Sequence, residues 1–352
     1  MLLRVIHETV YEYAPAVSNA QHVAHLRPVD TAAQRVLEHA LHIDPSPTQR
    51  SEVLDVFGNR RTFFSLPFTH ASLRVRAESL LETQAPPQPG TAGAGGDEDE
   101  SDDGADGGGA KPSLPWDAVR DGLRYHRGAP YASAAEFTFA SPYVPRHADF
   151  VAYARPSFPP GRALLPAAHD LMSRIHADFT YAAASTDVST PALEALAMRR
   201  GVCQDFAHIM IACLRGLGLA ARYVSGYLLT QPPPGQPRLV GSDASHAWVA
   251  VWVPHAGDAE RRETDSGDGT VGGAWHDLDP TNDRVPGEDY VTLAVGRDYA
   301  DVSPLRGVIH GGARHVLRVG VTVAPADHPV VAEVAAGTAA AAVAGTADRS
   351  TG

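Results

Sequence analysis

The chain has 352 residues, of which 44% are hydrophobic and 20% are charged, so it is long enough for two globular domains. The net charge at pH 7 is −12, but seven of the acidic residues lie in one low-complexity run between Asp97 and Asp106. Outside that run the chain is only mildly acidic, so we expect neither nucleic acid nor a membrane as a partner.

The first residues and the two cysteines bear on localisation. The start, MLLRVIHETVYEY, alternates and includes charged residues, so it lacks the apolar core of a signal peptide, and no run of 18 apolar residues follows. Cys203 and Cys213 lie on one expected helix, where ten residues separate them by about 15 Å, beyond disulfide reach. Two free thiols suit a reducing compartment, so we predict a cytoplasmic protein.

Residues 1–83 have the pattern of a small β domain. Short, partly alternating segments are separated by Asp, Pro and Gly-Asn turn signals: LLRVIHETVYEY, VLEHALHIDP, SEVLDVFGN, RRTFFSLPF and ASLRVRAESLLE. The histidines of this region are scattered, without a nearby nucleophile or carboxylate partner that would define a site. We therefore expect no chemistry in this domain.

Residues 84–115 read QAPPQPGTAGAGGDEDESDDGADGGGAKPSLP, and residues 325–352 are rich in Ala, Gly and Thr. The first segment has too little apolar surface to offset the entropy of ordering, so it is predicted to be a disordered linker. The second is predicted to be a mobile tail. Between them, residues 116–324 are expected to form the catalytic domain, and the alternating strand at 316–323 is expected to join its sheet.

Two helices are expected to lead to Cys203. In the segment 167–181, Leu171, Ile175 and Phe179 share one helical face, and a second helix begins near Pro191. After Gly201, apolar residues recur at helical spacing until Gly218, which is a natural stop. Cys203 therefore begins a buried helix. The free amides and positive dipole of such an end stabilise a thiolate, which makes the cysteine a candidate nucleophile.

Two later runs can supply partners for that sulfur. DASHAWVAVWVP places His246 at the head of a strand, with Trp248, Ala250 and Trp252 on the same face. AWHDLDPTND carries Asp277 and Asp279 on one side of a second strand, joined to the first by the polar loop 257–273. Thiolate, base and carboxylate are the groups that acyl transfer needs. Period-2 geometry alone does not choose between the two aspartates.

The blocks GVCQDFAH, RYVSGY, ASHAW and DLDPTN, in this order, resemble the transglutaminase-like superfamily of papain-type cysteine enzymes, in its bacterial branch with an added N-terminal domain. The resemblance implies an α+β fold in which a Cys-bearing helix packs on an antiparallel sheet bearing His and Asp. It also implies catalytic residues Cys203, His246 and Asp279, since the family's carboxylate directly precedes Pro-Thr-Asn. His276 and Asp277 are the alternatives for the third position.

The implied chemistry is acyl transfer at amide or peptide bonds, by hydrolysis or by transfer to an amine. The backbone amide of Cys203 would be one oxyanion donor, and Tyr181 is a weak candidate for a second. Asp205, in the first turn of the helix, is expected to have a structural role. No cofactor is expected, because GxGxxG after a strand and GxxxxGK[ST] are both absent.

Less specific interpretations remain for these residues. Cys203 would be an ordinary buried cysteine in a binding module that keeps the fold without catalysis. His208 together with Cys203 and His246 would suggest a zinc hydrolase, but their spacing is poor for metal ligands. Labelling of Cys203 well before Cys213, or stoichiometric zinc, would separate these possibilities.

Overall fold

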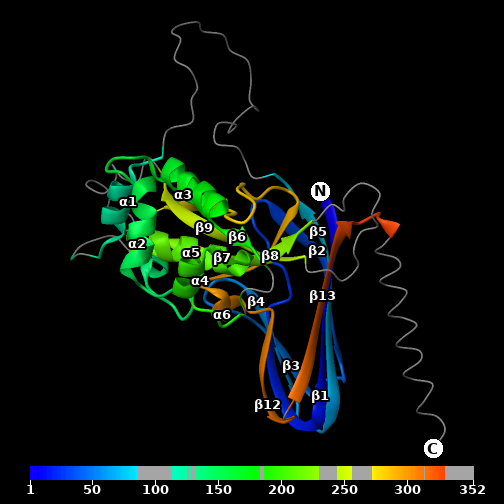
Figure 1. Cartoon of the computed structure of the whole chain (residues 1–352). Helices are drawn as coiled ribbons and strands as arrows, with labels where there is room; N and C mark the ends of the chain where they lie inside the picture. Colours follow the sequence, from blue (N-terminus) through cyan, green and yellow to red (C-terminus); the bar gives the residue numbers. More distant parts are fainter. Residues whose placement is uncertain are drawn as a thin grey trace, which may run out of the picture.

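The computed structural model describes residues 1–85, 113–125, 127, 132–182, 186, 188–229, 244–255, 272–312 and 314–329. The predicted linker lies outside the described residues except at its two ends, as do nearly all of the predicted tail and of the loop at 257–273. Figure 1 shows that the described chain forms two adjoining bodies, one in which helices surround a small sheet and one that is an elongated arrangement of strands.

The elongated body is an antiparallel sheet of seven strands in the described part of the chain. The first five strands are β1 (Leu2–Ala24), β2 (Gln34–Asp44), β3 (Gln49–Leu54), β4 (Arg60–Leu66) and β5 (His70–Thr83). The β-rich N-terminal region predicted from the sequence is confirmed. β1 is longer than predicted because the chain stays extended past Pro15, whose fixed φ is compatible with a strand.

Two strands from the other end of the chain complete this sheet. β12 (Leu305–Gly311) pairs with the second half of β1, and β13 (Arg314–Pro325) pairs with the first half. The prediction that the strand at 316–323 joins the catalytic sheet is therefore wrong. Alternation identifies a half-buried strand but does not name its partner. The other predicted domain limits stay predictions.

The helical body contains α1 (Trp116–Leu123), η1 (Ser133–Thr138), α2 (Ala148–Ala154), η2 (Arg155–Ser157), α3 (Leu164–Asp178), α4 (Ala192–Met198), α5 (Cys203–Gly216) and α6 (Tyr299–Val302). The expected helices before Cys203 are present as α3 and α4. α2 was not anticipated, since its seven residues are too few to reveal a clear helical period.

The sheet of this body has the strand order β10-β9-β8-β11, and each neighbouring pair is antiparallel. Its strands are β8 (Ala221–Leu228), β9 (Ser245–Pro254), β10 (Gly273–Leu278) and β11 (Tyr290–Gly296). α5 packs against β9 and β8. A short parallel pair, β6 (Thr180–Tyr181) and β7 (Arg200–Gly201), lies just before α5. The predicted α+β fold, with the cysteine helix on an antiparallel sheet, is confirmed.

The two sheets share a buried contact. Leu3 and Val5 of β1 and Val321 and Val323 of β13 pack in one cluster with catalytic-sheet residues that include Val291. Each of these side chains is at most 4% exposed. Burial of this apolar surface favours a fixed arrangement of the two bodies.

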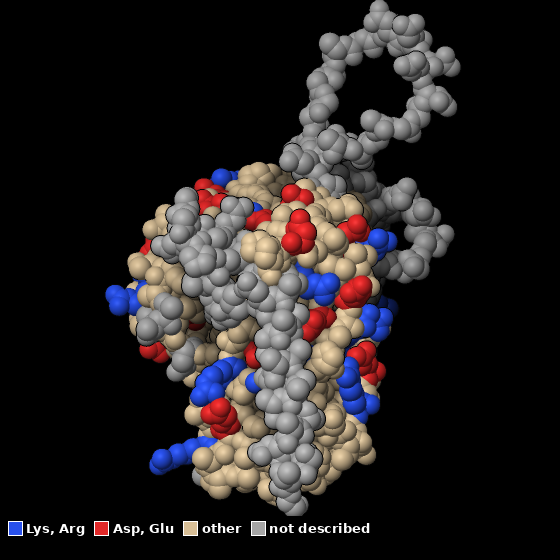
Figure 2. Space-filling view, turned by 90° about the vertical axis from the view of Figure 1, so that its right-hand side faces the viewer, with Lys and Arg blue, Asp and Glu red and all other residues tan. Residues whose placement is uncertain are grey.

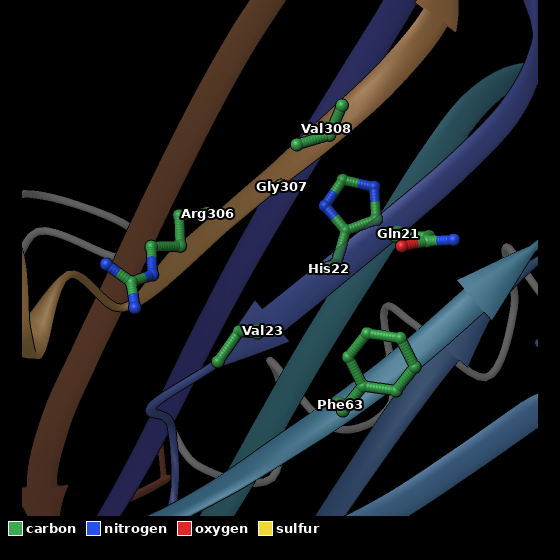
Figure 3. Close-up of a pocket in the computed structure, with 7 residues that line it drawn as sticks. All are labelled: Gln21, His22, Val23, Phe63, Arg306, Gly307 and Val308. Atoms are coloured by element: carbon green, nitrogen blue, oxygen red, sulfur yellow. The ribbon is translucent and has the colours of Figure 1, made fainter.

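The outer surface of the N-terminal sheet shows cationic and anionic side chains interspersed (Figure 2). Exposed ion pairs, such as those between Arg35 and Glu82 and between Arg318 and Glu12, account for part of this pattern. A hollow on this sheet, drawn in Figure 3, is lined by Gln21, His22, Val23, Phe63, Arg306, Gly307 and Val308. None of the residues predicted to carry chemistry lines it.

Candidate active site

The start of α5 holds Cys203 at a half-buried position. The helix begins at the cysteine itself, as predicted. Asp205 caps this end, because its Oδ2 accepts hydrogen bonds from the backbone N–H of Val202 at 2.8 Å and from the hydroxyl of Thr186 at 2.7 Å. Gly201 gives the carboxylate room, since an added Cβ there would collide with Asp205. The sulfur thus lies at the N-terminal end of the helix, where the helix dipole is positive.

The remainder of α5 anchors that position. Phe206, Ile209, Met210 and Leu214 are at most 2% exposed, and all belong to the main core. The helix ends as predicted, with Gly218 at a φ of +85°, a conformation that glycine adopts without strain. A helix buried along this much of its length cannot shift without opening the core, so the place of Cys203 is fixed.

His246 lies at the beginning of β9, where it is paired with Gly226 of β8. Gly226 is required there because an added Cβ would collide with the carbonyl oxygen of Val291 and with the ring of Trp248. This close approach accounts for the glycine in the RYVSGY block. Only 8% of the His246 side chain is exposed.

The side chain of His246 interacts with both Asp279 and Cys203. Its Nε2 donates to Oδ2 of Asp279 at 2.7 Å, and the side chain also forms a hydrogen bond with Cys203. Since Nε2 faces the carboxylate, Nδ1 is the nitrogen left for the sulfur. The structure therefore brings the three predicted residues together from α5, from β9 and from the turn after β10.

Asp279 is fully buried and accepts several hydrogen bonds. Besides that of His246, its Oδ2 accepts a bond from the amide nitrogen of Asn282 at 2.7 Å and one from the hydroxyl of Tyr290 at 2.7 Å. Its Oδ1 accepts from the backbone N–H of Thr281 at 2.8 Å. These donors hold the carboxylate in one orientation and compensate the cost of burying its charge.

The electrostatic surroundings of His246 favour the protonated, charged form of its ring. Burial alone lowers the pKa of His246, but the hydrogen bonds and charges of Asp279 and Cys203 outweigh burial and raise the pKa to about 10. Burial likewise raises the pKa of Asp279, and its bonds to His246, Asn282 and Tyr290 reverse that effect, so the pKa lies below its usual value. The ion pair is therefore the favoured state at neutral pH.

The alternative carboxylate, Asp277, lies elsewhere. Asp277 lies on β10 opposite Ala250 of β9, and Ala250 pairs on its other side with Arg222 of β8. Burial raises the pKa of Asp277 to about 6, against the opposing charge of Arg222. His276 points to the other side of the strand. Of the two aspartates that strand periodicity left open, Asp279 is the one that is hydrogen-bonded to His246.

Two other side chains singled out from the sequence, Cys213 and His208, are buried in the core. Cys213 is fully buried, and burial raises the pKa of its thiol. His208 is also buried, which lowers the pKa of its ring to about 3, and its Nε2 accepts the N–H of Tyr299 at 3.3 Å. In the described residues, no three His, Cys, Asp or Glu side chains gather as metal ligands would.

Sequence reasoning missed two groups at this site, Asn282 and Tyr290. Asn282 was visible in the DLDPTN block, where a side-chain amide three residues after the carboxylate can fold back onto it. Its Nδ2 also lies 3.3 Å from Nε2 of His246. Tyr290 begins a strand that no sequence pattern announced, so nothing local pointed to it.

The architecture and these residues are those of a cysteine-type catalytic fold. In such a fold a thiol at a helix N-terminus lies near a histidine–carboxylate pair carried by an antiparallel sheet. Two family models match the chain: the bacterial transglutaminase-like N-terminal region over residues 3–82 and the transglutaminase-like superfamily core over residues 153–280. The chain belongs to the transglutaminase-like superfamily, and it carries the bacterial N-terminal region of that family.

Similar proteins are found in mycobacteria, and one solved structure has a similar fold. An uncharacterized protein of Mycobacterium tuberculosis is 41% identical over 326 residues, which cover 92% of each chain. One from Mycobacterium leprae is 29% identical and covers 88% of this chain and 93% of its own. The crystal structure of a candidate cysteine protease from Cytophaga hutchinsonii has the same fold, with a TM-score of 0.64 at 19% identity over 93% of this chain and 91% of its own.

Among the described residues, no helix is long and apolar enough to cross a membrane.

Proposed function

We propose that the protein catalyses cysteine-dependent acyl transfer at amide or peptide bonds, with Cys203 as nucleophile, His246 as acid and base, and Asp279 as the group that orients the ring. One observation carries the proposal: a single histidine side chain is bonded through Nε2 to a buried carboxylate and also interacts with the cysteine at the start of α5.

In the first half-reaction the Cys203 sulfur attacks the carbonyl carbon of the amide. The developing oxyanion is stabilised by the backbone N–H of Cys203, for which the helix itself supplies no acceptor because it lies at the start of α5. The His246 imidazolium then gives its proton to the amide nitrogen, the C–N bond breaks, and the amine leaves. The products are a free amine and a thioester on Cys203.

In the second half-reaction neutral His246 removes a proton from water or from an amine, which attacks the thioester carbon. The C–S bond breaks, Cys203 leaves as a thiolate, and the protonated ring restores the ion pair. Asp279 accepts the hydrogen bond from Nε2–H throughout and stabilises the charged ring. Tyr181, which is 57% exposed on β6, stays a prediction as the second oxyanion donor.

Water is the acceptor we favour, since the candidate protease from Cytophaga hutchinsonii shares the fold. The substrate proposed is a peptide or protein amide. The two free cysteines support a reducing, cytoplasmic location for the reaction.

Thiol reactivity gives the first test. Iodoacetamide at neutral pH is expected to alkylate Cys203 well before Cys213, because only Cys203 is accessible and activated. Peptide mapping by mass spectrometry would measure both rates. Equal rates in the folded protein would count strongly against a nucleophilic Cys203.

Activity gives the second test. Incubation with a peptide library is expected to leave an acyl adduct on Cys203, and Cys203→Ala should lower turnover by at least about 1,000-fold. Cys213→Ala is the matched control and should keep the adduct. Adding a labelled primary amine separates the acceptors, because incorporation of the label shows transfer and its absence shows hydrolysis. Full turnover by Cys203→Ala would refute the mechanism.

A further inference from the structure

Side chains of the N-terminal domain cover one edge of the four-stranded sheet. β11 is the edge strand, so one row of its peptide groups has no partner within the sheet. Gln34, at the start of β2, donates its amide nitrogen to the carbonyl of Thr292 at 2.8 Å and accepts the N–H of Thr292 at 2.8 Å. The glutamine amide thus bonds this residue as a neighbouring strand would.

Asn59 makes the same pair of bonds three residues along the strand. It donates to the carbonyl of Val295 at 2.7 Å and accepts the N–H of Val295 at 2.8 Å. Residues three apart on a regular strand would face opposite edges. A bulge between Thr292 and Ala294 supplies the extra residue, so that both peptide groups face the N-terminal domain.

Both amides are buried and preorganised. Gln34 is 6% exposed and is held by a further bond to the carbonyl of Val29 at 2.7 Å. Asn59 is 1% exposed, and its amide nitrogen also donates to Asp55 at 2.9 Å. The loss of either amide would leave buried peptide groups of β11 unpaired, which is costly.

β11, the strand to which Gln34 and Asn59 are hydrogen-bonded, also carries Tyr290, whose hydroxyl donates to Asp279. Tyr290 is the first residue of β11, two residues before Thr292, and its ring packs edge-on against Trp248 at 5.4 Å. The loop before β11 is held by the same domain, since the hydroxyl of Thr83 donates to the carbonyl of Glu288. Contacts from the N-terminal domain therefore lie on both sides of Tyr290 along the chain.

We propose that the N-terminal domain is a working part of the active site: Gln34 and Asn59 fix β11 so that Tyr290 holds the Asp279 carboxylate against His246. Tyr290, Gln34 and Asn59 are positioning residues, since none of them touches the reacting sulfur. This inference rests on the proposed function of the Cys203–His246 pair but assigns a role to a domain that lies outside it.

The pH dependence of Cys203 alkylation is the readout, because it reports the charge state of the pair and needs no substrate. Tyr290→Phe removes one donor from Asp279, so the carboxylate should protonate more readily. The acid-side midpoint of alkylation is then expected to rise by about one pH unit. Gln34→Met, similar in length but unable to bond Thr292, should move the midpoint in the same direction.

The double variant that combines Gln34→Met with Tyr290→Phe distinguishes positioning of Tyr290 from a general loss of stability. If Gln34 acts through Tyr290, Gln34→Met should add no further shift in the Tyr290→Phe background. Gln49→Met, at an exposed glutamine of β3, is the matched control and should leave the midpoint unchanged. Thermal unfolding identifies folded variants, and Gln34→Glu, which keeps the acceptor and loses the donor, serves if Gln34→Met does not fold.

The outcomes separate the two proposals. A wild-type protein in which Cys203 shows no acid-side transition would defeat the proposed function itself. A wild-type transition that moves in Tyr290→Phe but not in the folded Gln34 variants would overturn only the role of the N-terminal domain. Additive shifts in the double variant would also overturn it.

Discussion

At the residue scale, the density of donors around Asp279 decides how the site behaves. A carboxylate that accepts from His246, Asn282, Tyr290 and a backbone N–H is held ionised although it is fully buried. Such a group can stabilise the charged ring without taking its proton. The orientation of the ring therefore depends on a carboxylate with very little freedom to move.

Replacement of that carboxylate by an amide tests its part. The Asp279→Asn change keeps the shape of the side chain. However, the amide can place an N–H opposite His246 Nε2, which is itself a donor, so the two N–H groups would face each other. The ring would then favour the wrong tautomer, and turnover should fall by roughly 10³–10⁴-fold. Steady-state kinetics would measure the loss. Asp277→Asn, two residues earlier on β10, is the control and should retain turnover, and equal losses would show that Asp279 has no special part.

The alkaline limit of activity follows from the pKa of His246, raised to about 10. Above that pH the ring loses its proton and can no longer donate to the leaving amine. Turnover should therefore fall as pH rises through about 10. A rate profile from pH 6 to 11 would measure it, and a decline centred near the ordinary pKa of 6.5 would contradict this electrostatic picture.

The sequence allowed prediction of the three residues that we propose act directly but not of those that contact them. Cys203, His246 and Asp279 stand in short blocks whose spacing reflects one local element each. Tyr290 reaches the site through a strand whose position depends on the N-terminal domain, more than 200 residues away in the chain. Local patterns carry no information on such a contact, because it exists only after both sheets have formed.

At the element scale, β8 and β11 meet closely at Gly226. An alanine there would collide with the Val291 carbonyl and with the Trp248 ring, neither of which can withdraw from a packed sheet. Gly226→Ala should lower the free energy of unfolding by about 2 kcal/mol or more, which urea denaturation would measure. Gly287→Ala is the matched control, since its nearest neighbour is an oxygen of the movable Asp289 side chain. Similar losses in both variants would contradict this account.

The elements themselves were predicted unevenly. α3, α5, β9 and β10 have clear periods and were anticipated within a few residues. The fold of residues 286–311 was not, because β11, α6 and β12 are short and owe their form to the surfaces that they cover. The assignment of β13 to the wrong sheet has the same origin, since its buried valines contact residues of both sheets.

At the scale of the whole molecule, buried histidines make stability depend on pH. Burial lowers the pKa of His7, His22 and His39 from 6.5 to about 4. Between these values the unfolded chain binds protons that the folded chain does not, so stability should fall as pH drops from about 6.5 to 4. His246 has the opposite sign, and its contribution is lost as pH rises from 6.5 toward 10.

Urea denaturation at pH 7 and pH 5 would measure this effect, with a lower midpoint expected at pH 5. His7→Gln should reduce the difference between the two midpoints, because glutamine has no proton to gain. His310→Gln, at an exposed position of β12, should leave the difference unchanged. A protein equally stable at both values would show that these rings are not the groups that govern acid unfolding.

The pairing of β1 with β13 joins residues separated by about 310 positions, with the whole helical body between them. A ribosome releases β1 long before its last partner exists, so nascent chains must hold a half-finished sheet while the rest is synthesised. The contact between the two bodies contains Val321 and Val323, and it is therefore the last part of the protein to close. Cysteine reactivity should accordingly appear only late in biosynthesis, when this final strand has docked.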